Sequence, residues 1–336
     1  MEVLADVMLK QAILALVSIT LHHMLEGLAA RLRQRCVGAA CCHRHWEDEM
    51  QPSLSGAPLE DALPSVGHDA RSFRERLRRV TFRSFKLARQ SIFPRSVSLH
   101  VMVGRTQRSG TNPLMDVLDA SLATRVFHET DGRAFRNYEM RDRSAIHQLA
   151  RRCPAPVFVI KALCELDQIA SLMRFLRPAK TLWVVRGWRD TARSAVRSFG
   201  DFVPQWKQLA YGASHGDWRG RGMSRATRDL LRSLFRSDAS EPDGAAIMWY
   251  YRNILFFEQA LEDDPRVRVT SYERLVRDPV TEVAEICEFL GVQRLRGSVI
   301  RRIHSTSVGR GTELNVAPEI AQICDRLHER FLGLQV

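Results

Sequence analysis

From residue 97 onward, short apolar runs rich in β-branched residues alternate with helical patterns, and this alternation constrains the fold most strongly. Strands separated by helices need crossover connections, which give a mostly parallel sheet covered by helices on both faces. We therefore expect an α/β fold of three layers, P-loop-like in its order, in which ligands bind at the carboxyl ends of the strands. The expected strands are residues 97–104, 157–162, 181–187 and 267–272, with helices starting near Pro113, Asp167, Asp190 and Val280.

The first expected strand leads into the segment GRTQRSGTNPL, residues 104–114. Thr111 and Asn112 suit the cap of a helix, and Pro113 suits its first turn. The segment therefore predicts a strand, a glycine-containing loop and a helix N-terminus. Backbone N–H groups from Arg108 to Asn112 would converge there, and the helix dipole favours an anion at that point.

The loop differs from the loops that bind nucleoside triphosphates. Five residues rather than four separate Gly104 from Gly110, and Thr111 stands where such loops have their lysine. The expected strand at 181–187 contains Arg186, whereas a magnesium-dependent P-loop enzyme needs an aspartate at a neighbouring strand end. These differences favour metal-free anion chemistry over the alternative of a P-loop kinase.

The string RSGTN followed by a helix resembles the nucleotide loop of the sulfotransferase family, which uses 3′-phosphoadenosine 5′-phosphosulfate (PAPS). The resemblance implies that Arg108 contacts the leaving phosphate and that Thr111 adds a hydroxyl contact. It also implies backbone contacts from Ser109, Gly110 and Asn112.

A second stretch, VVRGWRDTARSAV at residues 184–196, extends the resemblance. Arg186 and Ser194 are similar to the pair that holds the 3′-phosphate in the family, and a guanidinium can fork onto phosphate oxygens. The alternative is a surface arginine at a strand end with an unrelated serine. Residues 267–292 also resemble the family, with Tyr272 expected to pack in the core or to line the adenine.

The general base is expected in RVFHETDGRAF, residues 125–135. In the branch that sulfates protein tyrosines, a catalytic glutamate follows the loop arginine by 21 residues, and that count from Arg108 reaches Glu129. The resemblance implies Glu129 as the base and leaves His128 as the alternative, because other branches use a histidine. Asn112 departs from that branch, so the acceptor stays open among carbohydrate, lipid, small-molecule and peptide hydroxyls.

Three further residues have weaker assignments. Lys161 matches a lysine often found at this strand end in the family, although a structural salt bridge explains it equally well. Arg310 is a candidate to reach the nucleotide phosphates from a C-terminal loop, and Trp249 is expected in the core. Residues 212–225 and 236–244 are expected to be loops that flank a helix and help to form the acceptor pocket.

Charge and cysteine usage limit the partners. Lys and Arg outnumber Asp and Glu by 50 to 38, which gives a net charge of +12 and suits an anionic partner. The arginines are scattered and no recognition motif is present, so no nucleic acid is expected. Seven scattered cysteines favour a reducing compartment, and the Cys/His cluster at 36–45 has no zinc spacing, so no metal is expected.

The N-terminal part is expected to be a helical extension. Residues 11–25 carry no formal charge but are too few to span a membrane, and an amphipathic helix is the better interpretation. The basic segment 71–89 is either a solvated surface helix or a docking site for anionic lipid. The expected organisation is an amphipathic N-terminal helix with a Cys/His-rich tail, a linker with a basic helix, and a sulfotransferase-like catalytic domain, at residues 1–46, 47–95 and 96–336.

The sequence thus predicts an enzyme that moves a sulfuryl group from PAPS to an acceptor hydroxyl and leaves 3′-phosphoadenosine 5′-phosphate (PAP). A non-catalytic PAP-binding or membrane-attached module remains as an alternative. We expect a cytoplasmic protein, with peripheral membrane contact or self-association through residues 1–90 left open.

Overall fold

The computed structural model describes residues 80–107, 111–212, 218–295, 297–300, 303 and 314–334. The expectations for the N-terminal helix, the Cys/His cluster and the linker lie outside the described residues. The chain divides into two units between Phe93 and Pro94, and residues 80–92 of the first unit form a helix. Across the described ranges, the structure contains no helix with the length and apolar character that crossing a membrane requires.

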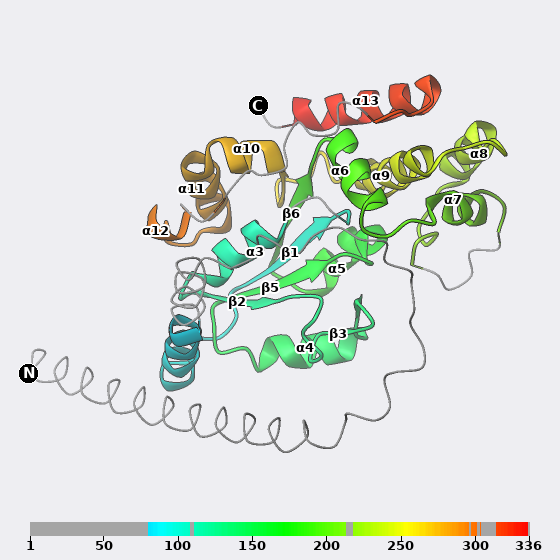
Figure 1. Ribbon diagram of the computed structural model, residues 1–336. Helices are drawn as coiled ribbons and strands as arrows, with labels where there is room; N and C mark the ends of the chain where they lie inside the picture. The colour runs from blue at the N-terminus through cyan, green and yellow to red at the C-terminus, as the bar shows by residue number, and fades with distance from the viewer. Residues whose placement is uncertain are drawn as a thin grey trace, which may run out of the picture. The chain divides into compact units, whose positions relative to one another are not determined.

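Five strands from the described residues of the second unit form one parallel sheet with the order β2-β5-β1-β6-β7 (Figure 1). The parallel sheet that the alternation predicted is confirmed. The short strand β2 was not predicted, because four residues are too few to show a strand pattern. The strands are β1 (Leu99–Arg105), β2 (Thr124–Phe127), β5 (Val157–Ala162), β6 (Ala179–Val185) and β7 (Val267–Ser271).

The strands that follow β1 in the sequence lie on both sides of it. The chain first builds β2 and β5 on one side of β1, and then crosses over to build β6 and β7 on the other side. The connections after β1 and β6 therefore diverge and open a crevice at the carboxyl ends of these two strands. Such a switch point is where open α/β sheets bind their ligands.

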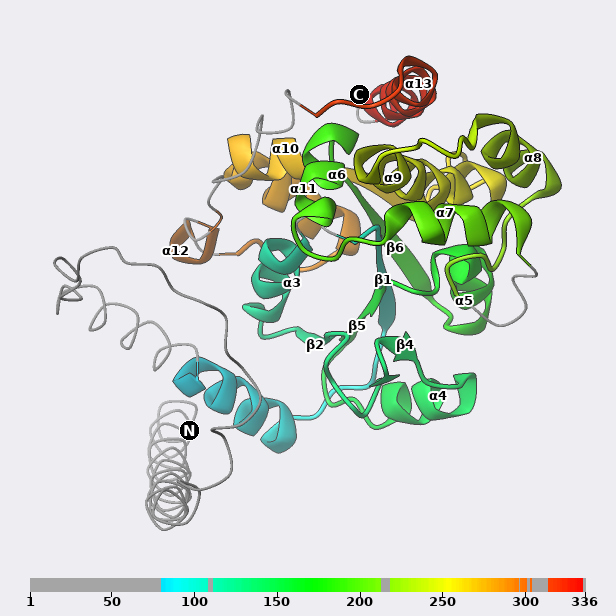
Figure 2. The same cartoon turned by 45° about the vertical axis from the view of Figure 1, so that its right-hand side comes forward.

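Helices cover both faces of the sheet, as the strand alternation requires (Figures 1 and 2). Val101 and Val103 pack on one face and Met102 on the other. The first face packs against α3 (Thr111–Asp119), α10 (Tyr272–Arg277), α11 (Pro279–Leu290) and α12 (Gly297–Ile300). The second packs against α4 (Arg143–Arg151), α5 (Ile169–Phe175), α6 (Trp188–Val196), α7 (Phe202–Tyr211), α8 (Arg225–Leu234), α9 (Glu241–Glu258) and α13 (Pro318–Gly333).

Local sequence signals explain the helix ends. Gly291 ends α11 with a φ of 70°, which confirms the predicted glycine cap. The expectation of a loop over residues 236–244 is wrong at its end, because α9 already begins at Glu241. Ser240 caps that helix, and its side chain and that of Asp243 each bond the other's backbone N–H. Of the other expected loop, residues 218–224 contain turns and no helix or strand, residues 213–217 lie outside the described residues, and Arg225 already begins α8, so that expectation is wrong at its last residue.

Candidate active site

The loop after β1 has the predicted framework of strand, loop and helix. β1 ends at Arg105, and α3 begins at Thr111. The helix therefore presents its N-terminal N–H groups at the crevice, where they favour an anion. Arg108, Ser109 and Gly110 lie outside the described residues, as do the side chains of Thr111 and Asn112, so their contacts stay predictions.

Gly104 lets β1 run close to its neighbour β6. A Cβ added at Gly104 would lie 3.1 Å from Cε3 of Trp183, the residue opposite it on β6, and 3.3 Å from Cδ2 of Leu166. These separations are tighter than ordinary van der Waals contact. The glycine at the start of the loop is thus explained by packing at the end of the strand.

Three strand ends bring charged side chains together around Glu129. Nζ of Lys161, on β5, donates a hydrogen bond to Oε1 of Glu129 at 2.5 Å. The Nη2 atom of Arg105, at the end of β1, lies 3.6 Å from the same oxygen. The Lys161 side chain is 0% exposed and that of Glu129 is 17% exposed. Glu129 follows β2 by two residues, so the cluster joins β1, β2 and β5.

This cluster sets the protonation of its members. Burial raises the pKa of Glu129, but the hydrogen bond and charge of Lys161 and the charge of Arg105 outweigh it and hold that pKa below its usual value. Burial and the nearby Arg105 lower the pKa of Lys161 to about 8. Burial, followed by the charge of Lys161, lowers the pKa of His128. At neutral pH Glu129 is therefore ionised and His128 is neutral, so both are able to accept a proton.

Arg186 is held in place at the carboxyl end of β6. It is buried, its guanidinium lies 4.8 Å from the ring centroid of Tyr272, and Nε1 of Trp249 donates to its carbonyl oxygen at 2.9 Å. Tyr272 is itself buried, which agrees with the packing alternative, and its contact with the adenine stays a prediction. Ser194 lies two turns into α6, the helix that follows Arg186, and is partly buried.

The start of α6 is tied to two later helices. The backbone N–H of Gly187 donates to Oε1 of Glu273, on α10, at 3.0 Å. Nε1 of Trp188 donates to Oδ1 of Asp325, on α13, at 2.7 Å. Arg189 donates to both carboxylate oxygens of the same Asp325, at 2.7 and 3.1 Å. These bonds fix the helix that carries Ser194 against the rest of the unit.

A narrow cleft adjoins the described end of the β1 loop, where Thr106 and Gln107 form part of its wall. Trp249, the expected core residue, is buried, as predicted, and also lines this cleft. The remaining wall is mostly apolar and comes from the end of β5, from α6, α7 and α9 and from the segment before α8, with Leu163, Thr191, Ala195, Phe202, Trp218, Ala245, Met248 and Arg252.

Three contacts of the site were not predicted from the sequence: those of Arg105 with Glu129, of Glu273 with Gly187 and of Trp249 with Arg186. A charged residue directly after an apolar run was the available signal for Arg105, whereas the other two contacts join distant segments. Arg310 lies outside the described residues, so its proposed reach stays a prediction. Among the described residues, no three His, Cys, Asp or Glu side chains are grouped to hold a metal ion.

Comparisons with known proteins agree on one family. A family model described as "Sulfotransferase domain" matches residues 99–317. Nodulation protein H of Rhizobium meliloti is 34% identical over 82 residues, which is 22% of this chain and 32% of that protein. The match thus spans about a third of the length of this curated relative.

Solved structures of sulfotransferases are also similar. The enzyme from Alicyclobacillus acidocaldarius matches with a TM-score of 0.41 and 16% identity, covering 72% of this chain and 94% of that one. A mouse sulfotransferase complexed with PAP matches with a TM-score of 0.39 and 16% identity, and the match covers 74% of this chain and 89% of the mouse chain.

Proposed function

Because the chain belongs to the sulfotransferase family, we propose that it transfers a sulfuryl group from PAPS to a hydroxyl group of an acceptor. The observation that carries the proposal is the cluster of Glu129, Lys161 and Arg105. It places a carboxylate and two cations at the same edge of the sheet as the loop before α3 and as Arg186.

The described residues fit a nucleotide with phosphates at two positions. Arg105 and Lys161 supply positive charge beside the β1 loop, and Arg186 supplies it across the switch point. A guanidinium presents its N–H groups in a planar fork that matches phosphate oxygens. In this proposal Arg186 and Ser194 hold the 3′-phosphate. The residues that hold the 5′-phosphosulfate are Arg108, Ser109, Gly110, Thr111 and Asn112.

PAPS, when bound, supplies an activated sulfuryl group, and the acceptor oxygen forms the new bond to sulfur as the bond from sulfur to the phosphate oxygen breaks. Glu129 takes the proton of the acceptor hydroxyl, since its carboxylate is ionised at neutral pH. Lys161 and Arg108 stabilise the negative charge that develops on the phosphate side. Arg105 and Lys161 also fix the orientation of the Glu129 carboxylate.

The pairing of Glu129 with two cations makes its carboxylate a weaker base, so His128 is the alternative proton acceptor. Burial keeps the imidazole of His128 neutral at neutral pH. Replacing Glu129 by Gln or His128 by Asn separates the two, because each change removes the basic atom and keeps most of the side-chain volume.

The first test is thermal unfolding of the full chain with PAP, compared with ATP plus Mg²⁺. At a ligand concentration about 100 times its Kd, binding adds roughly 2.7 kcal/mol to the free energy of unfolding. A rise in Tm with PAP but not with ATP and Mg²⁺ supports binding of the proposed nucleotide. A rise with ATP and Mg²⁺ alone supports a P-loop kinase, and PAP binding without turnover of PAPS on any acceptor supports a non-catalytic module.

A further inference from the structure

A second cavity, of about 170 Å³, shares no lining residue with the cleft beside the β1 loop. Its walls come from β4 (Glu139–Met140), which pairs with β3 (Phe135–Arg136), from α4, from the short helix η1 (Leu166–Gln168), from α5 and from the segment before α8; Figure 2 shows β4, α4 and α5 beside the sheet. Its polar lining includes Glu139, Arg141, Arg143, Glu165, Gln168 and Arg221.

The cavity belongs to the opposite face of the sheet from the Glu129 cluster. Ile146 and Leu172 line it and pack in the core of that face. Lys161 alternates along β5 with Ile160, which packs in the same core, so the Lys161 side chain points to the other face. None of the residues of the Glu129 cluster lines this cavity.

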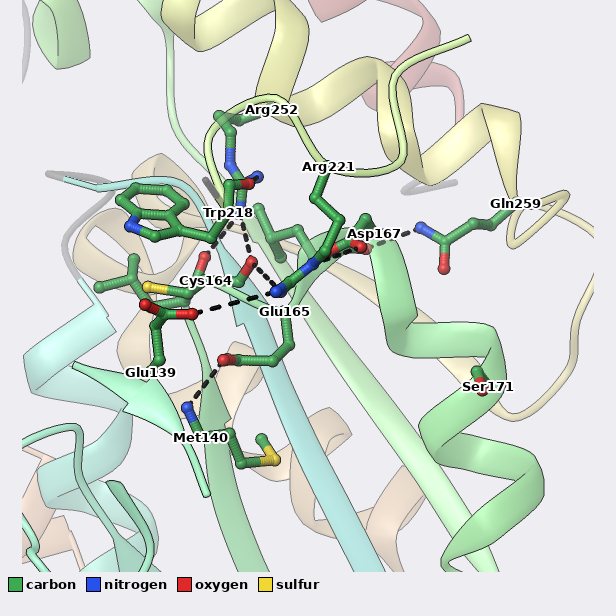
Figure 3. Close-up of polar contacts among 12 residues, drawn as sticks. Glu139, Met140, Cys164, Glu165, Asp167, Ser171, Trp218, Arg221, Arg252 and Gln259 are labelled. Carbon is green, nitrogen blue, oxygen red and sulfur yellow. Dashed lines mark hydrogen bonds and ion pairs between the residues drawn. The ribbon is translucent and has the colours of Figure 1, made fainter. Parts of the chain in front are cut away.

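Glu165 is the distinctive group of the wall. The residue is 5% exposed, and its Oε1 accepts a hydrogen bond from the backbone N–H of Met140 at 2.7 Å (Figure 3). Its Oε2 is buried and has no hydrogen-bond partner in the described part of the chain. A buried carboxylate oxygen without a donor carries a free-energy cost, which a hydrogen-bond donor on a ligand removes.

The charges of the lining balance. Three guanidiniums, from Arg141, Arg143 and Arg221, face three carboxyl groups, from Glu139, Asp142 and Glu165. Burial raises the pKa of Glu165 and so disfavours its charged form, but the buried carboxylate of Asp167 also pairs with Arg221 at 2.9 Å and adds negative charge behind the wall. A ligand with a net charge of either sign therefore gains little here, and a neutral ligand is favoured.

The arginines keep donor capacity beyond their present bonds. Arg143 donates to Oγ of Ser171 at 2.5 Å. Arg221 donates to Oδ2 of Asp167 at 2.9 Å and to the carbonyl of Cys164 (Figure 3). A guanidinium has five N–H donors, so further N–H groups remain for oxygen atoms of a ligand. A hydroxyl group meets both needs, because it donates to a carboxylate and accepts from a guanidinium.

We infer that this cavity binds a neutral polyhydroxylated ligand, the chemical class of sugars. One hydroxyl donates to Oε2 of Glu165, and neighbouring hydroxyls accept from Arg143 and Arg221 at the rim. The inference goes beyond the proposed function and does not depend on it, since it concerns a separate face of the sheet.

The test is saturation-transfer NMR on the full chain, without nucleotide, using glucose, galactose and N-acetylglucosamine as probes. We expect saturation transfer to at least one of these sugars and none to per-O-methylated glucose, which lacks hydroxyl donors. The Arg143→Ala and Glu165→Gln variants should each weaken that sugar's Kd about tenfold, as the loss of a hydrogen bond to a charged group does. Arg143 is exposed, so its variant keeps the proposal testable if the buried Glu165 variant does not fold.

Arg151→Ala is the matched control, because Arg151 is exposed on the same helix and does not line the cavity. It should bind the sugar as the wild type does. Absence of transfer to all three sugars, or equal affinity in wild type and both lining variants, overturns the inference. The Tm of Arg143→Ala is also measured with and without PAP, which tests the nucleotide site alone. Loss of sugar binding with a normal Tm shift, or the reverse, therefore shows which of the two proposals fails.

Discussion

Nε1 of Trp249 donates a hydrogen bond to the carbonyl oxygen of Arg186 at 2.9 Å. The bond joins the middle of α9 to the residue that follows β6, and both groups are buried. Because the side chain of Arg186 also lies over Tyr272, the arginine is fixed from its backbone and from its guanidinium. We regard Trp249 as a positioning residue for the proposed phosphate contact.

Replacing Trp249 by Phe keeps an aromatic ring but removes the donor, so Arg186 should be less well fixed. We expect PAP affinity to fall about two- to tenfold, as for the loss of one neutral hydrogen bond. Calorimetric titration with PAP measures this. Trp206→Phe is the matched control, because Nε1 of buried Trp206 donates to the carbonyl of Leu231 at 3.0 Å, away from the cleft. An equal loss of affinity in both variants would show a general effect of lower stability.

Arg186→Ala should lose phosphate recognition worth about 1.5–3 kcal/mol, because it removes hydrogen bonds to a charged group. Arg186→Lys keeps the charge but loses the planar fork, so its PAP affinity should lie between wild type and the Ala variant. Arg197→Ala, at the exposed end of α6, should bind PAP normally. The assignment of Arg186 is wrong if Arg186→Ala binds PAP as tightly as wild type does.

Glu129→Gln should lower the rate of sulfuryl transfer about 10²- to 10⁴-fold if Glu129 is the base. Its PAP affinity should change little, since no contact of Glu129 with the nucleotide is proposed. The comparison with His128→Asn decides the role: the larger fall in kcat identifies the base. Sulfation at the wild-type rate in Glu129→Gln excludes that residue.

The buried Lys161 predicts a pH dependence of stability. Its pKa is lowered to about 8 from 10.5, so the unfolded chain holds more protons than the folded chain between these values. The contribution of Lys161 to the free energy of unfolding therefore rises with pH through this window, on the order of 1 kcal/mol between about pH 7 and about pH 9. Urea unfolding of wild type and Lys161→Met at the two pH values measures it.

In that experiment the wild type should gain stability relative to Lys161→Met as the pH rises. Lys180→Met is the control, since Lys180 lies near the start of β6, far along the sheet from the Glu129 cluster. If the rise in the free energy of unfolding with pH were reduced equally in Lys161→Met and Lys180→Met, its assignment to Lys161 would be wrong.

Gly104→Ala should destabilise the fold by about 1–3 kcal/mol, because the new methyl group crowds the ring of Trp183 at 3.1 Å. Gly132→Ala is the control, because a Cβ at Gly132 has no atom within 4 Å. Urea unfolding gives both values. Equal free energies of unfolding of the two variants would show that the structure around Trp183 accommodates the methyl group without loss of stability.

The sequence predicted the parts of the fold that depend on local pattern. The run VFVIKA predicted β5 without error in its bounds, and Gly291 predicted the end of α11. β2 was missed because its four residues are too few to show alternation, and α9 starts earlier than expected because Pro242 is compatible with a first helical turn.

The candidate site was predictable where it depends on strand ends. Arg186 stands directly after β6, as the sequence indicated; Lys161 lies near the end of β5, and Glu129 follows β2 by two residues. The contacts that fix these residues were not predictable, because Trp249 is 63 residues from Arg186 and Lys161 is 32 from Glu129. No periodicity reports a contact over such separations.

The bonds between Arg189 and Asp325 join positions 136 residues apart. A growing polypeptide therefore carries α6 for a long stretch of its synthesis before its carboxylate partner exists. Until Asp325 has been synthesised, Arg189 and the indole of Trp188 lack the carboxylate to which they donate in the folded protein. The helix that holds Ser194 should consequently be among the last parts of a nascent chain to become protected from proteases.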